Sequence, residues 1–151
     1  MQNALLFEAA GQRYALEAAD IVEVIPAVHL RSLPGVPAYV AGVFRYRGVI
    51  VPVIDLSQLI GNTPAAARLS TRIILTRHVG ANGQVHILGL RAEKATDIMA
   101  SDASAPMPSG VVAAEAPYLG GLSQQGGALV QFINVLQLLP TAVRDSLFVE
   151  S

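Results

Sequence analysis

The chain contains one segment twice, and this repeat constrains its fold more than any other feature. Residues 39–61 (YVAGVFRYRGVIVPVIDLSQLIG) align without a gap to residues 118–140 (YLGGLSQQGGALVQFINVLQLLP). Identical pairs stand at Tyr39/Tyr118, Gly42/Gly121, Gly48/Gly127, Ile54/Ile133, Gln58/Gln137 and Leu59/Leu138. A match at so long a period indicates two copies of one structural unit. A chain of 151 residues is long enough for two small lobes that share a core.

The composition supplies ample material for burial and excludes several classes of function. Apolar residues make up 52% of the chain and charged residues 14%, so a large buried area is expected. A net charge of −1 with 5% aromatic residues is not typical of a nucleic-acid-binding protein. The apolar stretches are interrupted too often to insert into a membrane, and no secretory signal is visible. Cysteine is absent, which excludes disulfides and thiol catalysis, and a soluble cytoplasmic protein is expected.

Short apolar runs at regular spacing predict an all-β fold. Strands are expected at residues 4–9, 13–16, 20–25, 40–45, 49–54, 72–78 and 85–90, with a closing pair in the second copy of the repeat. Proline-rich loops fill 26–38 and 101–117, and 143–151 is a tail or helix. Two similar halves of this kind indicate two small β-barrels. One lobe is expected at about 15–65 and the other at about 70–140, and an exchange of the N-terminal strands between them stays open.

Asp55 is the one carboxylate whose position invites a catalytic interpretation. Its counterpart in the second copy is Asn134, which keeps a side-chain oxygen but loses the charge. A helix cap needs only that oxygen, so Asp55 is predicted to cap a helical turn at LSQLI. No carboxylate or second histidine lies at a metal-binding i, i+4 spacing from the three histidines, which are His29, His78 and His86. No catalytic motif, cofactor site or metal site is predicted.

Arg45 and Arg47 are the main chemical difference between the two copies, because Gln124 and Gly126 replace them in the second. Alternating residues on a strand point the same way, so both guanidinium groups are predicted to project from one face. The repeated fold does not require charge there, which makes the two arginines candidates for binding a carboxylate or carbonyl on another protein. A solvated hairpin tip is the alternative. Valines at 22, 24 and 28 add apolar area if they are not buried in the core.

The chain resembles the CheW-like adaptors of bacterial chemosensory arrays. The resemblance is carried by YVAGVFRYRGVIVPVIDLSQLIG, by RYALEAADIVEVI before it, and by YLGGLSQQGGALVQFINVLQLL near the end. It implies two intertwined SH3-like five-stranded barrels and no enzymatic activity. In the family, such adaptors join a CheA-type histidine kinase, through its CheW-like regulatory domain, to the cytoplasmic tip of methyl-accepting chemotaxis receptors. The receptor helix lies in an apolar groove between the lobes, and recruitment to membrane-associated arrays is implied.

The resemblance also implies which residues contact partners. Arg47 and Gly48 match the family's Arg-Gly, whose arginine is implicated in partner contact. Val22 and Gly42 fall where receptor-facing residues lie in the family, with Val24 beside them. Thr71 begins a strand that lines the same groove. The predicted partner-binding set is therefore Val22, Val24, Gly42, Arg45, Arg47, Gly48 and Thr71.

Two departures from the family pattern bear on the choice of partner. Arg45 replaces the usual asparagine, and LGLRAEKATDIM carries Arg91 and Lys94 where the family is usually apolar and acidic. These changes would suit an adaptor of a specialised array, such as one that controls a diguanylate cyclase or surface behaviour. Self-association or ring assembly with the kinase stays open. Two alternative functions also stay open. One is a small ligand-binding or enzymatic barrel that uses Asp55, Arg47 and His29. The other is a decoy of the same fold that occupies the kinase without engaging receptors.

Overall fold

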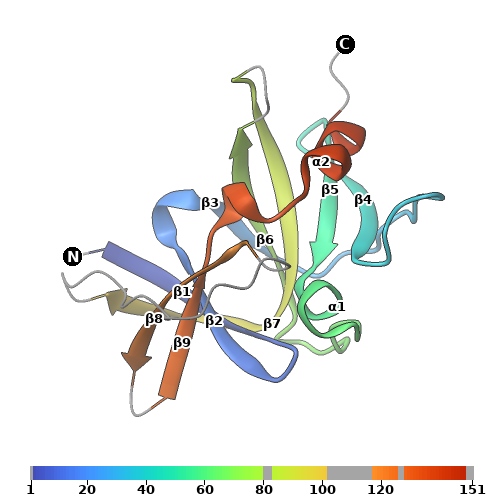
Figure 1. Ribbon diagram of the computed structural model, residues 1–151. Helices are drawn as coiled ribbons and strands as arrows, with labels where there is room; N and C mark the ends of the chain where they lie inside the picture. Colours follow the sequence, from blue (N-terminus) through green and yellow to red (C-terminus); the bar gives the residue numbers. More distant parts are fainter. Residues whose placement is uncertain (1, 80–82, 102–116, 126–127, 149–151) are drawn as a thin grey trace.

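The structure is a computed structural model that describes residues 2–79, 83–101, 117–125 and 128–148 (Figure 1). Strands dominate these residues: β1 (Gln2–Ala9), β2 (Gln12–Glu17), β3 (Ile21–Pro26), β4 (Val40–Tyr46), β5 (Val49–Asp55), β6 (Arg72–Val79), β7 (Val85–Ser101), β8 (Leu119–Gln125) and β9 (Ala128–Ile133). The helices are short: η1 (Ala18–Asp20), α1 (Leu56–Gly61), η2 (Val135–Gln137) and α2 (Thr141–Leu147). The all-β prediction is confirmed.

The strands form two groups joined by β7. The first group contains β3, β6, the first part of β7, β5 and β4, and the second contains the rest of β7, β1, β2, β9 and β8. Both copies of the repeat form an antiparallel hairpin whose second strand runs parallel to a strand from elsewhere in the chain. These parallel pairs are β5 with β7 and β9 with β2. The two groups are therefore built alike, as the repeat predicts.

The long strand β7 follows a curved path (Figure 1) and changes its pairing partner along its length. Residues 85–92 pair with β6, and residues 93–101 pair with β1. Lys94 has a φ of 50°, and the pairing with β1 shifts register between Leu6 and Glu8. A non-glycine residue at positive φ is uncommon in a strand, and here it lies where β7 passes from one group to the other. The sequence interpretation ended this strand at residue 90 and so missed the crossing.

The lobes do not follow chain order. The strand β6 was expected in the second lobe, but it pairs with β3 and with the first part of β7. Conversely, β1 and β2 come first in the chain yet pair with the end of β7 and with β9. Each group therefore contains strands from both halves of the chain. The first group is complete only when the chain extends to residue 92, and the second group needs strands from residue 2 to residue 133.

Alternation along the strands places side chains in three apolar clusters. In β1, Leu5 and Phe7 lie in a core shared by both groups, whereas Ala4 lies in a smaller cluster of the second group. The repeat shows the same division, because Ile54 and its counterpart Ile133 both lie in the shared core. The residues Val51 and Val53 lie in the first group's own cluster, and their counterparts Val130 and Phe132 lie in that of the second. These strands therefore pack on two sides, with alternate residues in the shared core and in the cluster of their own group.

Candidate partner-binding surface

The turn between β4 and β5 positions the two arginines singled out by the repeat. Tyr46 pairs with Val49, which leaves Arg47 and Gly48 as a two-residue loop with φ values of 48° and 82°. Positive φ at both positions defines a type I′ turn, whose twist matches that of the flanking strands. The prediction that Arg45 and Arg47 alternate along one strand is therefore wrong. Arg45 belongs to β4, but Arg47 is the first residue of the turn.

Arg47 lies beside β3, where it meets a carboxylate. Its Nη2 is 3.3 Å from Oε1 of Glu23, and its guanidinium carbon is 5.1 Å from the centre of the Tyr46 ring. The Tyr46 hydroxyl donates to the same Glu23 oxygen, and this hydrogen bond raises the pKa of Tyr46. The Arg47 side chain is 75% exposed. An ion pair so exposed stabilises the fold by about 0–1 kcal/mol, so Arg47 can exchange it for a partner's group at little cost.

Arg45 has no such internal partner. Its side chain is exposed and makes no hydrogen bond or ion pair with other residues that the structure describes. It stands opposite Ile50 of β5, which is 60% exposed. An exposed cation beside an exposed aliphatic side chain suits protein binding. The guanidinium can donate directed hydrogen bonds to a partner, and the aliphatic side chain can bury apolar area against it. In the second copy of the repeat, the Gln124 side chain and Gly126 lie outside the described residues.

The valines of β3 are on the surface. Val22 and Val24 are 38% and 36% exposed, and Val28 beyond the strand is 42% exposed. The other face of β3, which carries Ile21, Glu23 and Ile25, is half-buried. Glu23 is turned toward the β4–β5 hairpin, where the Tyr46 hydroxyl and the Arg47 guanidinium donate to its carboxylate. The exposed face carries the valines.

Gly42 and Thr71 do not belong to this surface. A Cβ at Gly42 would lie 2.4 Å from the carbonyl oxygen of Arg31, whose backbone pairs with Val43 and covers the glycine. Thr71 is 3% exposed, and its hydroxyl donates to the carbonyl of Ala66. Both residues were predicted to contact a partner, and that contact stays a prediction. In the structure, each of them is enclosed by its own chain. Gly48 is exposed and serves as the second turn residue.

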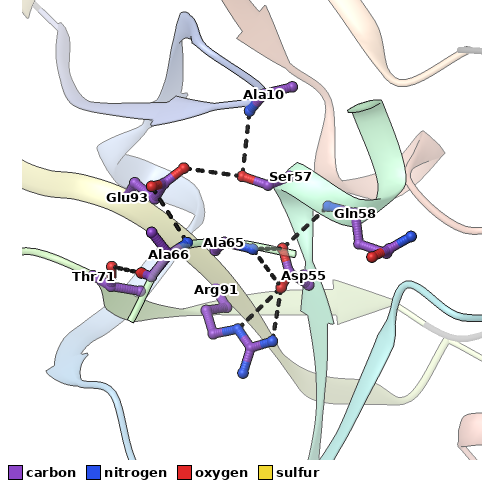
Figure 2. Close-up of polar contacts among 9 residues, drawn as sticks. All are labelled: Ala10, Asp55, Ser57, Gln58, Ala65, Ala66, Thr71, Arg91 and Glu93. Carbon is purple, nitrogen blue, oxygen red and sulfur yellow. Dashed lines mark hydrogen bonds and ion pairs between the residues drawn. The ribbon is translucent and has the colours of Figure 1, made fainter. Parts of the chain in front are cut away.

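Asp55 is the centre of a buried polar cluster (Figure 2). Its carboxylate accepts hydrogen bonds from the backbone N–H groups of Gln58, at 3.2 Å, and Ala65, at 3.0 Å. Arg91 of β7 donates to Oδ2 through Nη2 at 2.7 Å and Nε at 3.2 Å. Asp55 is 2% exposed, so this ion pair is largely shielded from water. The predicted helix cap is confirmed, and the same carboxylate also holds the following loop and joins β5 to β7.

The two charges of β7 that depart from the family pattern are paired within the fold. Arg91 pairs with Asp55, and Nζ of Lys94 is 3.3 Å from Oε2 of Glu8. Glu93, between them, accepts hydrogen bonds from the Ser57 hydroxyl at 3.3 Å and from the backbone of Ala66 at 3.4 Å (Figure 2). This stretch of β7 therefore connects α1, the 62–71 loop and β1. Its unusual charges need no external partner.

The polar groups of the rival ligand-binding interpretation are not brought together. Asp55 is buried with Arg91, Arg47 lies at an exposed turn beside Glu23, and His29 is exposed in the loop after β3. A cavity of about 310 Å³ lies elsewhere, lined by Glu17, Asp20, Gly120, Gly121, Phe132, Ile133 and Asn134.

The structure also bears on metal binding and membrane insertion. Among the described residues, no group of three or more histidine, cysteine, aspartate or glutamate side chains could hold a metal ion. The part of the chain that the structure describes also contains no helix with the length and hydropathy needed to cross a bilayer.

A family model described as the CheW-like domain matches residues 3–143. The chain belongs to the CheW-like family. Among curated relatives, Protein FrzA of Myxococcus xanthus is 29% identical over 93% of this chain and 87% of its own length. Chemotaxis protein CheW of Klebsiella aerogenes is 24% identical over 91% of this chain and 81% of its own. The crystal structure of the scaffolding protein TtCheW from Thermoanaerobacter tengcongensis superposes with a TM-score of 0.81 at 24% identity, covering 94% of this chain and 90% of that one. The CheW-like β fold is thus confirmed.

Three residues at these sites were missed by sequence reasoning. Glu23 and Tyr46 bind Arg47, and Arg91 binds Asp55. An isolated acid among β-branched residues in β3 was a signal for a specific partner, since a strand gains little from a lone charge. The Asp55–Arg91 pair had no local signal, because 36 residues separate the two in sequence. Only the parallel pairing of β5 with β7 places them opposite each other.

Proposed function

We propose that this CheW-like protein is a non-enzymatic adaptor that couples a CheA-type histidine kinase to the cytoplasmic tip of a chemoreceptor. The observation that carries this proposal is a family match over nearly the whole chain, together with an exposed apolar and cationic surface that the fold itself does not require. The names of the relatives, which include a chemotaxis protein and a scaffolding protein, agree with such a role.

The proposed contacts lie in two patches, which are Val22 and Val24 on the exposed face of β3 and Arg45, Arg47 and Ile50 on the β4–β5 hairpin. The aliphatic side chains would supply area to a partner helix or strand, and the two guanidinium groups would supply directed hydrogen bonds to a carboxylate or a carbonyl. Arg47 is held over Tyr46 by stacking and by Glu23, so its orientation is partly set before a partner arrives. Such preorganisation lowers the entropy lost on binding.

The hypothesis of a specialised array now depends on Arg45 alone. Arg91 and Lys94 form internal ion pairs, so they say nothing about the partner. Arg45 remains as a surface cation with no partner among the described residues. We infer that the cognate receptor or kinase presents an acidic or carbonyl group opposite this position. An array that controls surface behaviour or a diguanylate cyclase is one setting in which such a partner would occur.

The decisive experiment compares binding by the unmodified chain with binding by Arg47→Asn. Asparagine tolerates positive φ, so this variant keeps the type I′ turn while it removes the guanidinium. We expect an affinity at least about tenfold lower for the kinase regulatory domain or for the receptor tip, since a lost charge-assisted contact costs about 1.5–3 kcal/mol. Isothermal titration with each purified partner measures the change.

Arg13→Asn is the matched control, because Arg13 is also an exposed arginine beside a hairpin turn, on β2. It should bind both partners as the unmodified chain does. Equal affinity for Arg47→Asn with both partners would remove Arg47 from the interface. Capture of the adaptor from its native cell separates an adaptor from a decoy: recovery of kinase together with receptor supports coupling, and recovery of kinase alone contradicts it.

A further inference from the structure

Two histidines face each other on the β6–β7 hairpin beneath the C-terminal helix. His78 and His86 are directly opposite in the antiparallel register, so their side chains lie on the same face. Phe148, which follows α2, covers both rings. Its ring centre is 4.6 Å from that of His86 in a stacked arrangement and 5.4 Å from that of His78 edge to face.

Within the part of the chain that the structure describes, most nitrogens of the two imidazoles beneath Phe148 have no hydrogen-bond partner. His78 is fully buried, and neither Nδ1 nor Nε2 has a partner. Nε2 of His86 and Nε of Arg144 in α2 are likewise buried without partners. A neutral imidazole tolerates such a site, but an imidazolium would carry two buried N–H groups with nothing to accept them.

The surroundings of His78 disfavour its protonation. Burial has the largest effect in lowering the pKa of His78, and the nearby Arg144 and His86 lower it further. The neighbouring 3-10 turn η2 carries no charged residue, and Arg77 on β6 itself donates to the carbonyl of Ala19. No carboxylate in the described part of the chain forms an ion pair with either histidine. A proton on His78 therefore has no compensating anion among these groups.

The helix that covers the pair is weakly attached. Its N-cap is Pro140, which makes no side-chain cap hydrogen bond, and the helix has only seven residues. It packs on the shared core through the half-buried side chains of Val143, Leu147 and Phe148. An isolated helix this short is unstable in water, so α2 depends on that packing.

We propose that α2 is a proton-operated latch: protonation of His78 displaces Phe148 and releases α2 from the β6–β7 hairpin. Release would let water solvate the imidazolium and move it away from Arg144. It would also uncover the part of the shared core that Val143, Leu147 and Phe148 cover. The latch requires no kinase or receptor and is independent of the adaptor role.

The direction of the pH response follows from the lowered pKa. Above the ordinary histidine value of 6.5 neither the closed nor the open state holds the proton, and the latch keeps its full stability. Below that value the open state binds a proton and the closed state does not. The ratio of open to closed latch then rises about tenfold for each pH unit, until the lowered pKa of the closed state is reached.

A spin label on α2 tests this proposal. The chain has no cysteine, so Ala142→Cys on the exposed side of α2 creates a single labelling site on the full chain. We expect the mobile fraction of a nitroxide at this site to rise steeply between about pH 7 and about pH 5, as the linkage requires. In the His78→Leu background, where nothing titrates at that position, the fraction should stay constant. His29→Leu, at an exposed histidine, should respond as the parent does.

Three outcomes would overturn the latch. They are a constant mobile fraction in the parent, an equal pH response in His78→Leu, and a loss of far-UV circular dichroism in step with label mobility, which would indicate global unfolding. If His78→Leu does not fold, Phe148→Ala gives an independent test. It removes the cover and should leave the label mobile at both ends of the pH range. A pH response as steep as that of the parent would contradict the proposal.

Discussion

At the scale of single residues, the repeat allows equivalent positions in its two copies to be compared. Asp55 and Asn134 both cap the turn that follows a strand, accepting from Gln58 and Leu136 respectively. Their backbones are also bound alike, since each N–H donates to the carbonyl of the repeat's first tyrosine, at 2.8 Å and 2.7 Å. Only Asp55 carries a charge, and only Asp55 has an arginine opposite it. The charge is therefore explained by Arg91 and not by capping.

A double-mutant cycle tests that explanation. Asp55→Ala should lower the free energy of unfolding by about 2–4 kcal/mol, because the cap, the loop contact and the ion pair are lost together. Arg91→Ala should cost less, since the Arg91 side chain is 27% exposed and the cap survives. Urea denaturation of both single variants and the double variant should give a coupling energy of about 1–2 kcal/mol. Strict additivity would mean that the pair contributes nothing.

Gly42 provides a second prediction at this scale. Alanine there would place Cβ 2.4 Å from the Arg31 carbonyl, so the bridge between Arg31 and Val43 must open. We expect a loss of about 3 kcal/mol or more in unfolding free energy. Gly48→Ala is the matched control, since Gly48 also has positive φ but has nothing within 4 Å of the position that a Cβ would take. It should cost about 1 kcal/mol from backbone strain alone. Equal losses for both variants would rule out the steric explanation.

At the scale of elements, the β4–β5 hairpin has a type I′ turn whose first residue, Arg47, is of a type that rarely adopts the positive φ this turn requires. Arg47 adopts a φ of 48°, in the left-handed region that asparagine and glycine occupy more readily. The exposed ion pair with Glu23 recovers little of that cost. A residue retained against its local preference is a candidate for function, because such conflicts concentrate at functional sites.

This conflict predicts that stability and binding change in opposite directions. Arg47→Asn should raise the free energy of unfolding by about 0.5–1 kcal/mol, since asparagine is preferred at this position of a type I′ turn. Thermal and urea unfolding measure the gain. Arg47→Val, which is β-branched and disfavoured at positive φ, should destabilise the protein. A destabilised Arg47→Asn would show that the ion pair and the stacking on Tyr46 matter more than the turn preference.

At the scale of the whole molecule, the shared core joins the two strand groups into one unit. It contains Leu5 and Leu16 from β1 and β2, Ile74 and Leu88 from β6 and β7, and Ile133 from β9. Because β7 serves both groups, neither can be completed by one half of the chain. Folding should therefore be a single cooperative transition.

Splitting the chain at the 61–70 loop tests this point. Fragments 1–66 and 67–151 should each lack a cooperative thermal transition, because each is missing strands of both groups. Mixing them should restore near-UV circular dichroism, since all the paired strands are then present. An uncut chain treated in the same way is the control. A fragment that melts cooperatively on its own would show that the lobes are contiguous after all.

Sequence reasoning was most accurate where the signal is local. The cap at Asp55, the positions of most strands and the all-β class depend on neighbouring residues, and the structure agrees on each. It failed for the length of β7, because the second half of that strand is defined by its pairing with the distant strand β1. The enclosure of Thr71 and Gly42 likewise depends on distant or separate segments of the chain. Family resemblance places residues in order along a chain but does not say which backbone covers them.

The sequence by itself determined that this protein is a duplicated β structure, because one pattern of apolar runs and turns is repeated in both halves. The CheW-like type was implied by resemblance to the family. Only the tertiary structure decided which charges are free. Among the described residues it pairs Asp55 with Arg91 and Lys94 with Glu8, while it leaves Arg45 exposed. The physical reason is that an ion pair depends on distance in space. Strand pairing across the whole chain sets that distance, and no local pattern encodes it.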